Sequence, residues 1–160
     1  FILDIEEFHI PKSLKRVIKK NIFEIKFNKE FKNVIINCAN AKREDQEGTW
    51  ITESMIEAYT KLHEAGFAHS FESYLDGELV GGGYGVILGN IFCGESMFTK
   101  ETNASKVAFV SLVERLKKNG FKIIDTQIHT EYLESFGAKH IKREKYLEFV
   151  KSALENPREF

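Results

Sequence analysis

A run of strand-like segments and short turns constrains the fold of this chain more than any other feature. The three segments are 68–75, 78–88 and 91–98. They are separated by Asp76-Gly77 and by Gly89-Asn90. Two-residue connections of this composition join neighbouring antiparallel strands. The pattern therefore predicts an antiparallel meander at the centre of the fold.

The meander is followed by a helical segment and a further strand. Apolar residues recur at helical spacing through 103–120, which begins at a capping residue, Asn103, and ends at a glycine. The segment 121–128 is apolar until its end, as expected for a central strand. Because Asp125 and Gln127 lie two residues apart, we expect their side chains to point to the same face of the sheet.

The rest of the chain is predicted to be mainly helical. Residues 41–48 are polar and charged, which indicates an exposed loop. The other predicted elements are a basic amphipathic helix over 11–20, a strand over 23–27, a helix capped by Asn28, and helices over 52–66, 131–136 and 143–151. We therefore expect an α/β (α+β) domain over 1–160, with a mixed, mainly antiparallel sheet flanked by helices.

Composition limits the function classes. The 160 residues suffice for one domain with a core, and 23 basic residues nearly balance 24 acidic ones, so any nucleic-acid surface must be local. Two cysteines, Cys38 and Cys93, do not form a disulfide framework, and we expect both to be reduced. There is no membrane-spanning apolar run and no signal-peptide pattern, so the expected compartment is the cytoplasm.

Two carboxylates stand among apolar neighbours, where burial without a partner is costly. Asp125 belongs to a functional site or caps a turn that follows the strand. Glu95 recognises a cation or forms an ion pair with a lysine such as Lys106. His69, His129 and His140 have no partners at metal-ligand spacing, so we expect no metal site.

Five sequence blocks occur in a fixed order along the chain. They are Gly48-Thr49-Trp50-Ile51, residues 81–86, residues 94–98, Asn103-Ala104-Ser105-Lys106 and Asp125-Thr126-Gln127. Together they resemble the leucyl/phenylalanyl-tRNA–protein transferases over about residues 8–150. The resemblance implies an N-acetyltransferase-like (GNAT-like) fold, with an additional N-terminal domain upstream. It also implies an aminoacyltransferase that moves Leu or Phe from aminoacyl-tRNA to the N-terminal Arg or Lys of a protein, which marks that protein for degradation.

The resemblance also implies roles for individual residues. Gln127 and Asp125 would help deprotonate the attacking α-amino group, and Glu95 would recognise the positive charge of the acceptor. Trp50 would stack on the 3′-terminal adenosine of the tRNA, with Tyr59 on the same wall; a lone tryptophan is otherwise most often a core residue. No cofactor is implied, and we expect a monomer.

The transferred side chain requires an apolar pocket. The candidates are Phe92, Met97, Phe109, Leu112 and Ile124, which are also ordinary core residues by type. Gly83 stands where better-known relatives carry methionine, so it affects the shape of the pocket. The tRNA backbone would be bound by the basic residues of the first helix, which otherwise form a solvated face: Lys12, Lys15, Arg16, Lys19 and Lys20.

Two alternative functions remain open at this level. The first is an acetyl-CoA-dependent N-acetyltransferase, which is disfavoured because the turn before the 103–120 helix lacks an Arg- and Gly-rich pyrophosphate loop. The second is a non-catalytic module that binds tRNA or degrons. The glycines of 81–85 are followed by a strand rather than a helix, so they indicate a kinked strand or a close approach rather than a phosphate site.

Overall fold

The computed structural model describes residues 1–41 and 49–160. Within them the chain forms a six-stranded sheet in the order β1-β6-β5-β4-β3-β2. The strands are β1 (Ile2–Asp4), β2 (Glu24–Phe27), β3 (Ala68–Leu75), β4 (Glu78–Leu88), β5 (Ile91–Thr99) and β6 (Ile123–Asp125). All neighbouring strands are antiparallel except β5 and β6, which are parallel. The predicted meander and the mixed, mainly antiparallel sheet are confirmed.

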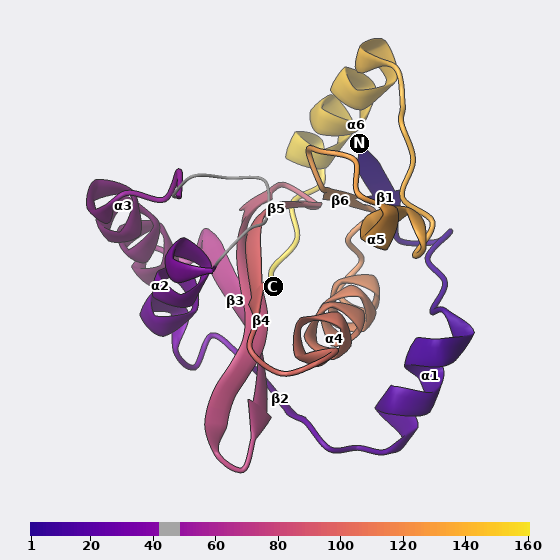
Figure 1. The fold of residues 1–160 in the computed structure, drawn as a ribbon. Helices are drawn as coiled ribbons and strands as arrows, with labels where there is room; N and C mark the ends of the chain where they lie inside the picture. The colour runs from indigo at the N-terminus through magenta and orange to yellow at the C-terminus, as the bar shows by residue number, and fades with distance from the viewer. Residues whose placement is uncertain (42–48) are drawn as a thin grey trace.

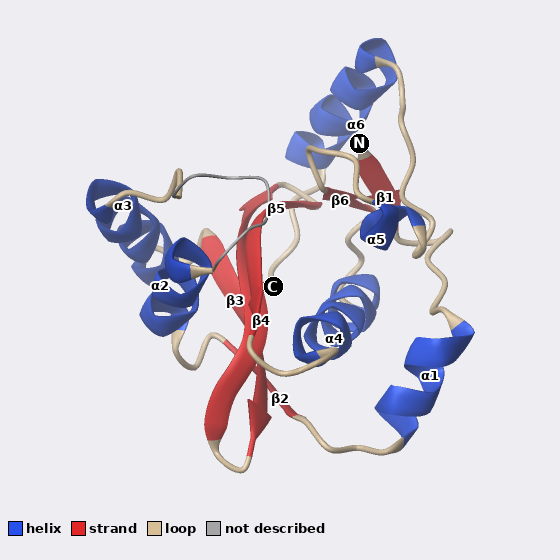
Figure 2. Cartoon of the chain, viewed as in Figure 1, coloured by secondary structure: helices blue, strands red, loops and turns tan. Residues whose placement is uncertain are grey.

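Helices cover both faces of this sheet (Figures 1 and 2). They are α1 (Lys12–Lys19), α2 (Phe31–Asn40), α3 (Glu53–Glu64), α4 (Ala104–Lys118), α5 (Glu131–Glu134) and α6 (Arg143–Glu155). Helix α4 packs on one face, with α1 and α5 beside it, whereas α2 and α3 pack on the other. Helix α6 covers the end formed by β5, β6 and β1. None of the described helices has the length and apolar character needed to cross a membrane.

The core is divided between the two faces of the sheet. Phe109 and Leu112 of α4 are buried against Phe92 of β5 in the larger cluster. On the opposite face, Ile35 of α2 is buried in a cluster that includes Tyr84 of β4. Burying one such side chain stabilises the fold by about 1.5–3 kcal/mol, so the apolar spacing of α4 and α2 accounts for their docking. Cys38 and Cys93 are free thiols, as expected.

The glycines of β4 allow other backbone segments to approach closely. A Cβ atom at Gly81 would lie 2.6 Å from the Cβ of Ala104, at the start of α4. A Cβ atom at Gly85 would lie 2.3 Å from the carbonyl oxygen of Cys93 on the neighbouring strand. Real side chains do not tolerate these distances. The close approach that the glycine run predicts is therefore confirmed.

The start of α2 differs from the prediction. Asn28 does not cap this helix, whose N-cap position is Glu30. Asn28 has a left-handed φ of 58°, and its Oδ1 accepts the backbone N–H of Ser70 on β3. The fully buried Glu72 accepts the N–H of Glu30 instead. The prediction was wrong because the donors near this helix start are satisfied by a carboxylate from a distant strand.

Other elements differ mainly in extent. Strand β6 ends at Asp125 rather than continuing to residue 128, because Gln127 has a left-handed φ of 62°. Asn103 does precede α4, but its side chain makes no capping hydrogen bond. Thr52 caps α3 by accepting the N–H of Met55. The predicted loop over 41–48 lies, from residue 42 onward, outside the described residues, as does Gly48 of the first sequence block.

Candidate active site

A cavity opens where two parallel strands part. Strands β5 and β6 pair over Ile91–Cys93 and Ile123–Asp125, and beyond these residues β5 continues without β6. The space between them is a cavity of about 530 Å³. It is lined by residues from both faces of the sheet: Trp50, Phe71, Tyr84, Phe92, Gly94, Glu95, Ser96, Met97, Phe109, Leu112, Ile124, Thr126, Gln127, Ile128, Thr130, Tyr132 and Leu133.

The inner wall of the cavity is apolar. It contains all five side chains proposed from the sequence for an apolar pocket: Phe92, Met97, Phe109, Leu112 and Ile124. Gly83 does not line the cavity. However, a Cβ atom at Gly83 would lie 2.6 Å from Cζ of Phe71 and 2.7 Å from Cγ of Met97, and both of these residues do line it. Gly83 therefore affects the shape of the cavity through the side chains in front of it.

Glu95 enters the cavity because of a β-bulge. Tyr84 pairs with Ser96 and Gly85 pairs with Gly94, so Glu95 has no partner on β4. Bulges re-aim side chains in this way and are frequent beside active sites. The ion pair with Lys106 is not formed among the described residues, since the Nζ of that lysine lies 5.4 Å from the centre of the Tyr132 ring. Glu95 instead lies close enough to the Tyr59 hydroxyl to help raise its pKa.

Two aromatic residues from the segment around α3 meet this edge of the cavity. Trp50 lines the cavity and is 41% exposed, so a ring face is accessible to a planar ligand. Tyr59 does not line the cavity itself, but it packs edge-to-face on Tyr84 with ring centroids 5.2 Å apart. Burial, followed by the charge of Glu95, raises the pKa of Tyr59 to about 12. Tyr59 is therefore a neutral hydrogen-bond donor.

Asp125 and Gln127 do not share a strand face as the sequence predicted. Asp125 Oδ1 accepts the backbone N–H of Gln127 at 2.9 Å and holds the turn that ends β6. The amide of Gln127 turns back, and its Nε2 donates to the carbonyl oxygen of Gly94 at 3.1 Å. Gln127 lines the cavity and bridges the parted strands, whereas Asp125 does not line it. The turn-capping role that the sequence left open for Asp125 is thus the one observed.

Sequence reasoning missed several residues of the site. Tyr132 and Leu133 follow Thr130, which caps the short helix α5 through the N–H of Leu133. The buried hydroxyl of Tyr132 has no hydrogen-bond partner among the described residues. Tyr146 of α6 donates a hydrogen bond of 2.7 Å to Asp125 Oδ2. Only the tertiary fold brings these segments to the cavity, and no local sequence pattern reveals them.

The basic residues of α1 lie on the α4 side of the sheet (Figure 1). All five basic residues of the helix and its C-cap are exposed: Lys12, Lys15, Arg16, Lys19 and Lys20. A smaller cavity of about 240 Å³ lies where α1 meets α4 and α5, and it shares Tyr132 with the main cavity. The helix therefore flanks the candidate site.

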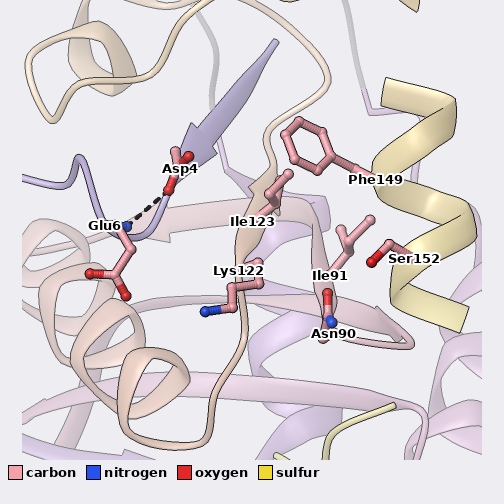
Figure 3. Close-up of a pocket in the computed structure, with 8 residues that line it drawn as sticks. All are labelled: Asp4, Glu6, Asn90, Ile91, Lys122, Ile123, Phe149 and Ser152. Atoms are coloured by element: carbon pink, nitrogen blue, oxygen red, sulfur yellow. Dashed lines mark hydrogen bonds between the residues drawn. The ribbon is translucent and has the colours of Figure 1, made fainter. Parts of the chain in front are cut away.

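A different cavity of about 280 Å³ lies beside α6 (Figure 3). Its acidic residues already serve the local structure. Asp4 Oδ1 accepts the backbone N–H of Glu6 at 3.0 Å, and Glu6 forms an ion pair of 2.9 Å with Lys117. Among residues 1–41 and 49–160, no three His, Cys, Asp or Glu side chains are grouped so that they could hold a metal ion. The larger cavity is therefore the candidate active site.

Comparison with known proteins places the chain in a family. Residues 2–151 match the family model described as leucyl/phenylalanyl-tRNA protein transferase. A protein of that name from Flavobacterium johnsoniae is 49% identical over 94% of this chain and 71% of its own length. Another from Sulfurimonas denitrificans is 50% identical over 92% of this chain and 64% of its own length. One from Myxococcus xanthus is 46% identical, with coverages of 98% and 67%.

Solved structures share the fold at low sequence identity. An aminoglycoside acetyltransferase from an uncultured soil metagenomic sample superposes with a TM-score of 0.50 at 14% identity, over 83% of this chain and 88% of its own. L-PGS from Bacillus licheniformis superposes with a TM-score of 0.52 at 13% identity, over 98% of this chain and 56% of its own. The acetyltransferase-like fold that the sequence predicts is confirmed.

Proposed function

Because the chain belongs to the leucyl/phenylalanyl-tRNA–protein transferase family, we propose that it moves Leu or Phe from charged tRNA to the N-terminal Arg or Lys of a protein. One observation carries this proposal. An apolar chamber and two polar groups, Glu95 and Gln127, share a single cavity between the parted strands. An aminoacyl side chain and a cationic acceptor require such a combination.

The aminoacyl end of the tRNA fits the two parts of the cavity. The Leu or Phe side chain enters the apolar chamber, where Met97 adapts to either shape. The terminal adenine stacks on the exposed face of Trp50, which contributes about 1–3 kcal/mol for one base. The ester carbonyl then lies near the mouth of the cavity, beside the amide of Gln127.

The chemistry is attack of the acceptor α-amino group on this ester. A new amide C–N bond forms, the ester C–O bond to the tRNA ribose breaks, and the amine proton passes to the leaving oxygen through solvent. Gln127 Nε2 is engaged by Gly94, so Oε1 is the atom that accepts a hydrogen bond from the amine. Asp125 keeps Gln127 in place, and Glu95 attracts the positive charge of the acceptor.

The remaining partners follow from surface chemistry. The basic residues of α1 bind the acceptor stem of the tRNA through its phosphates, and the choice of tRNA comes from the aminoacyl group. The protein works as a monomer in the cytoplasm, where charged tRNA is present. Its product, a protein with a new bulky N-terminal residue, is then recognised for degradation.

Acetyl-CoA is the less suitable donor. The backbone N–H groups of Lys100 and Glu101, in the turn before α4, both donate to the carbonyl oxygen of Val80. These amides are already used within the fold, and the turn lacks the Arg- and Gly-rich sequence that binds a pyrophosphate. A calorimetric titration with CoA should show no binding.

The proposal is tested with labelled Leu-tRNA or Phe-tRNA and two peptides, one beginning with Arg and one with Ala. We expect label on the Arg peptide alone, and none when Asp125→Ala replaces the wild type, although charged tRNA still binds. Transfer to both peptides would show that the protein does not select an acceptor with N-terminal Arg. Binding of tRNA without any transfer by the wild type would identify a binding module instead.

A further inference from the structure

Tyr146 of α6 contacts the carboxylate that holds the turn at Gln127. Its hydroxyl donates to Asp125 Oδ2 at 2.7 Å, while Oδ1 of the same carboxylate accepts the N–H of Gln127 at 2.9 Å. Each oxygen of Asp125 therefore has its own donor, one from a helix and one from the turn. Hydrogen bonds to an ionised carboxylate are stronger than those between neutral groups. The carboxylate is fixed on both sides.

The environment of Tyr146 keeps it a donor. Burial, followed by the hydrogen bond to Asp125, raises the pKa of the Tyr146 hydroxyl above its usual range. Cys93 pairs with Asp125 across β5 and β6, and burial with the charges of Asp125 and Glu95 raises the pKa of its thiol to about 11. The thiol is thus neutral and adds no second negative charge beside Asp125.

Helix α6 provides a firm support for this hydroxyl. Ala153, two turns further along the helix, is fully buried with Ile91 and Ile123 of the paired strands. Beyond the end of the helix, Asn90 Nδ2 donates to the carbonyl oxygen of Asn156 at 3.2 Å. The helix is therefore docked on the same strands that part to form the cavity, which fixes the position of Tyr146 relative to Asp125.

We propose that Tyr146 is a positioning residue for the acceptor amine. It orients Asp125, Asp125 holds the left-handed turn at Gln127, and the turn places the Gln127 amide at the mouth of the cavity. The inference rests on the proposed function, because it concerns the same site. Loss of the hydroxyl leaves one Asp125 oxygen without its donor, so the turn and the Gln127 amide lose their fixed orientation. Trp50 and the apolar chamber are untouched.

The test compares Tyr146→Phe with Tyr74→Phe in the transfer assay with Leu-tRNA and the Arg peptide. Tyr74 is a matched control, because its hydroxyl also donates to a carboxylate, Glu72, at 2.8 Å, on a part of the sheet away from the cavity. We expect kcat to fall about tenfold in Tyr146→Phe, as for loss of a hydrogen bond to a charged group, with KM for Leu-tRNA changed less than about twofold. Tyr74→Phe should keep the wild-type kcat.

A double-mutant cycle separates positioning from a general structural role. In the Gln127→Ala background, for which we expect a reduced but measurable rate, Tyr146→Phe should have no further effect on kcat, because the amide that it positions is gone. An unchanged kcat in Tyr146→Phe, an equal loss in Tyr74→Phe, or a full additional loss in the double variant would each overturn the inference. Absence of transfer by the wild type would instead refute the proposed function.

Discussion

Glu95 and Gln127 reach the cavity through local departures from regular strand geometry. Glu95 is the unpaired residue of a bulge, and Gln127 is itself left-handed, two residues beyond the end of β6. The sequence predicted both as site residues. It did not predict the geometry, because a bulge and a left-handed turn depend on strand register and on the Asp125 hydrogen bond. Asp125 was expected on the same strand face as Gln127. Instead it lies outside the cavity lining and accepts the backbone N–H of Gln127.

Glu95 should determine which acceptor is used. Glu95→Gln removes the charge with little change of shape and leaves an oxygen that can accept from Tyr59. We expect kcat/KM for the Arg peptide to fall about tenfold or more, as for loss of one charge-assisted interaction, while KM for Leu-tRNA stays unchanged. Steady-state kinetics with each substrate varied in turn measure this. A rise in the KM for Leu-tRNA with the acceptor unaffected would place Glu95 on the tRNA side instead.

His69 should make stability depend on pH. Burial lowers its pKa to about 4, and Asn28 donates to its Nδ1, which must therefore be unprotonated. Between its unfolded pKa of about 6.5 and the folded value, the unfolded chain binds more protons, so the free energy of unfolding falls as the pH falls. In His69→Phe, which preserves the ring stack on Phe160, this loss should be smaller by about 1–2 kcal/mol, a value reduced for solvent screening because His69 is only half-buried. Urea unfolding at pH 7 and pH 4.5 measures the difference, and identical losses in both proteins would contradict it.

Strands β5 and β6 define the site because they pair briefly and then part. The meander and α4 were predictable, since turn residues and apolar spacing are local signals. The short β6 and the docking of α6 were not, because they depend on contacts between distant segments. The start of α2 illustrates the same limit. Asn28 is a residue type that often caps helices, but the carboxylate of buried Glu72 accepts the backbone N–H of Glu30 instead. At this helix start, a hydrogen bond from a distant strand overrides the local capping preference of Asn28.

The close packing of β4 and β5 should make Gly85 irreplaceable. In Gly85→Ala, the new Cβ would lie 2.3 Å from the Cys93 carbonyl oxygen, so we expect a loss of about 1–3 kcal/mol or more, as for overpacked cores. Gly94→Ala is the matched control, because its Cβ would meet only the Asp125 carbonyl oxygen at 3.6 Å. Chemical denaturation of both variants measures the contrast. Equal stabilities would show that the strands adjust freely.

In the proposed function, the surface that binds the tRNA backbone and the cavity where the chemistry occurs are different parts of the molecule. Helix α1 flanks the α4 side of the sheet (Figure 1). The cavity is lined by residues of β5 and by residues that follow β6. The fold class and eight of the 17 residues that line the cavity could be predicted from the sequence, because they depend on apolar pattern and on ordered motifs. The involvement of α5 and α6 could not, because nothing local in Tyr132 or Tyr146 indicates which strands they meet.

Reversing charge on α1 should weaken tRNA binding uniformly. For Lys15→Glu with Arg16→Glu, we expect lower affinity for charged tRNA and a slope of log Kd against log salt that is smaller by about 1–2, since each lost phosphate contact removes roughly 0.7–0.9. Lys151→Glu, an exposed change on α6, is the control and should leave the slope unchanged. Fluorescence anisotropy at several salt concentrations provides the measurement. An unaltered slope in the α1 variant would exclude this helix from the tRNA surface.

The central claim is that the Gln127 amide, held at the mouth of the cavity, orients the acceptor amine. The most direct measurement is the single-turnover rate of Leu transfer to the Arg peptide by Gln127→Ala, together with its Kd for Leu-tRNA. We predict a rate about 100-fold lower than that of the wild type, as for loss of a group that acts in proton transfer, and a Kd within about twofold. A wild-type rate in the variant would contradict the account.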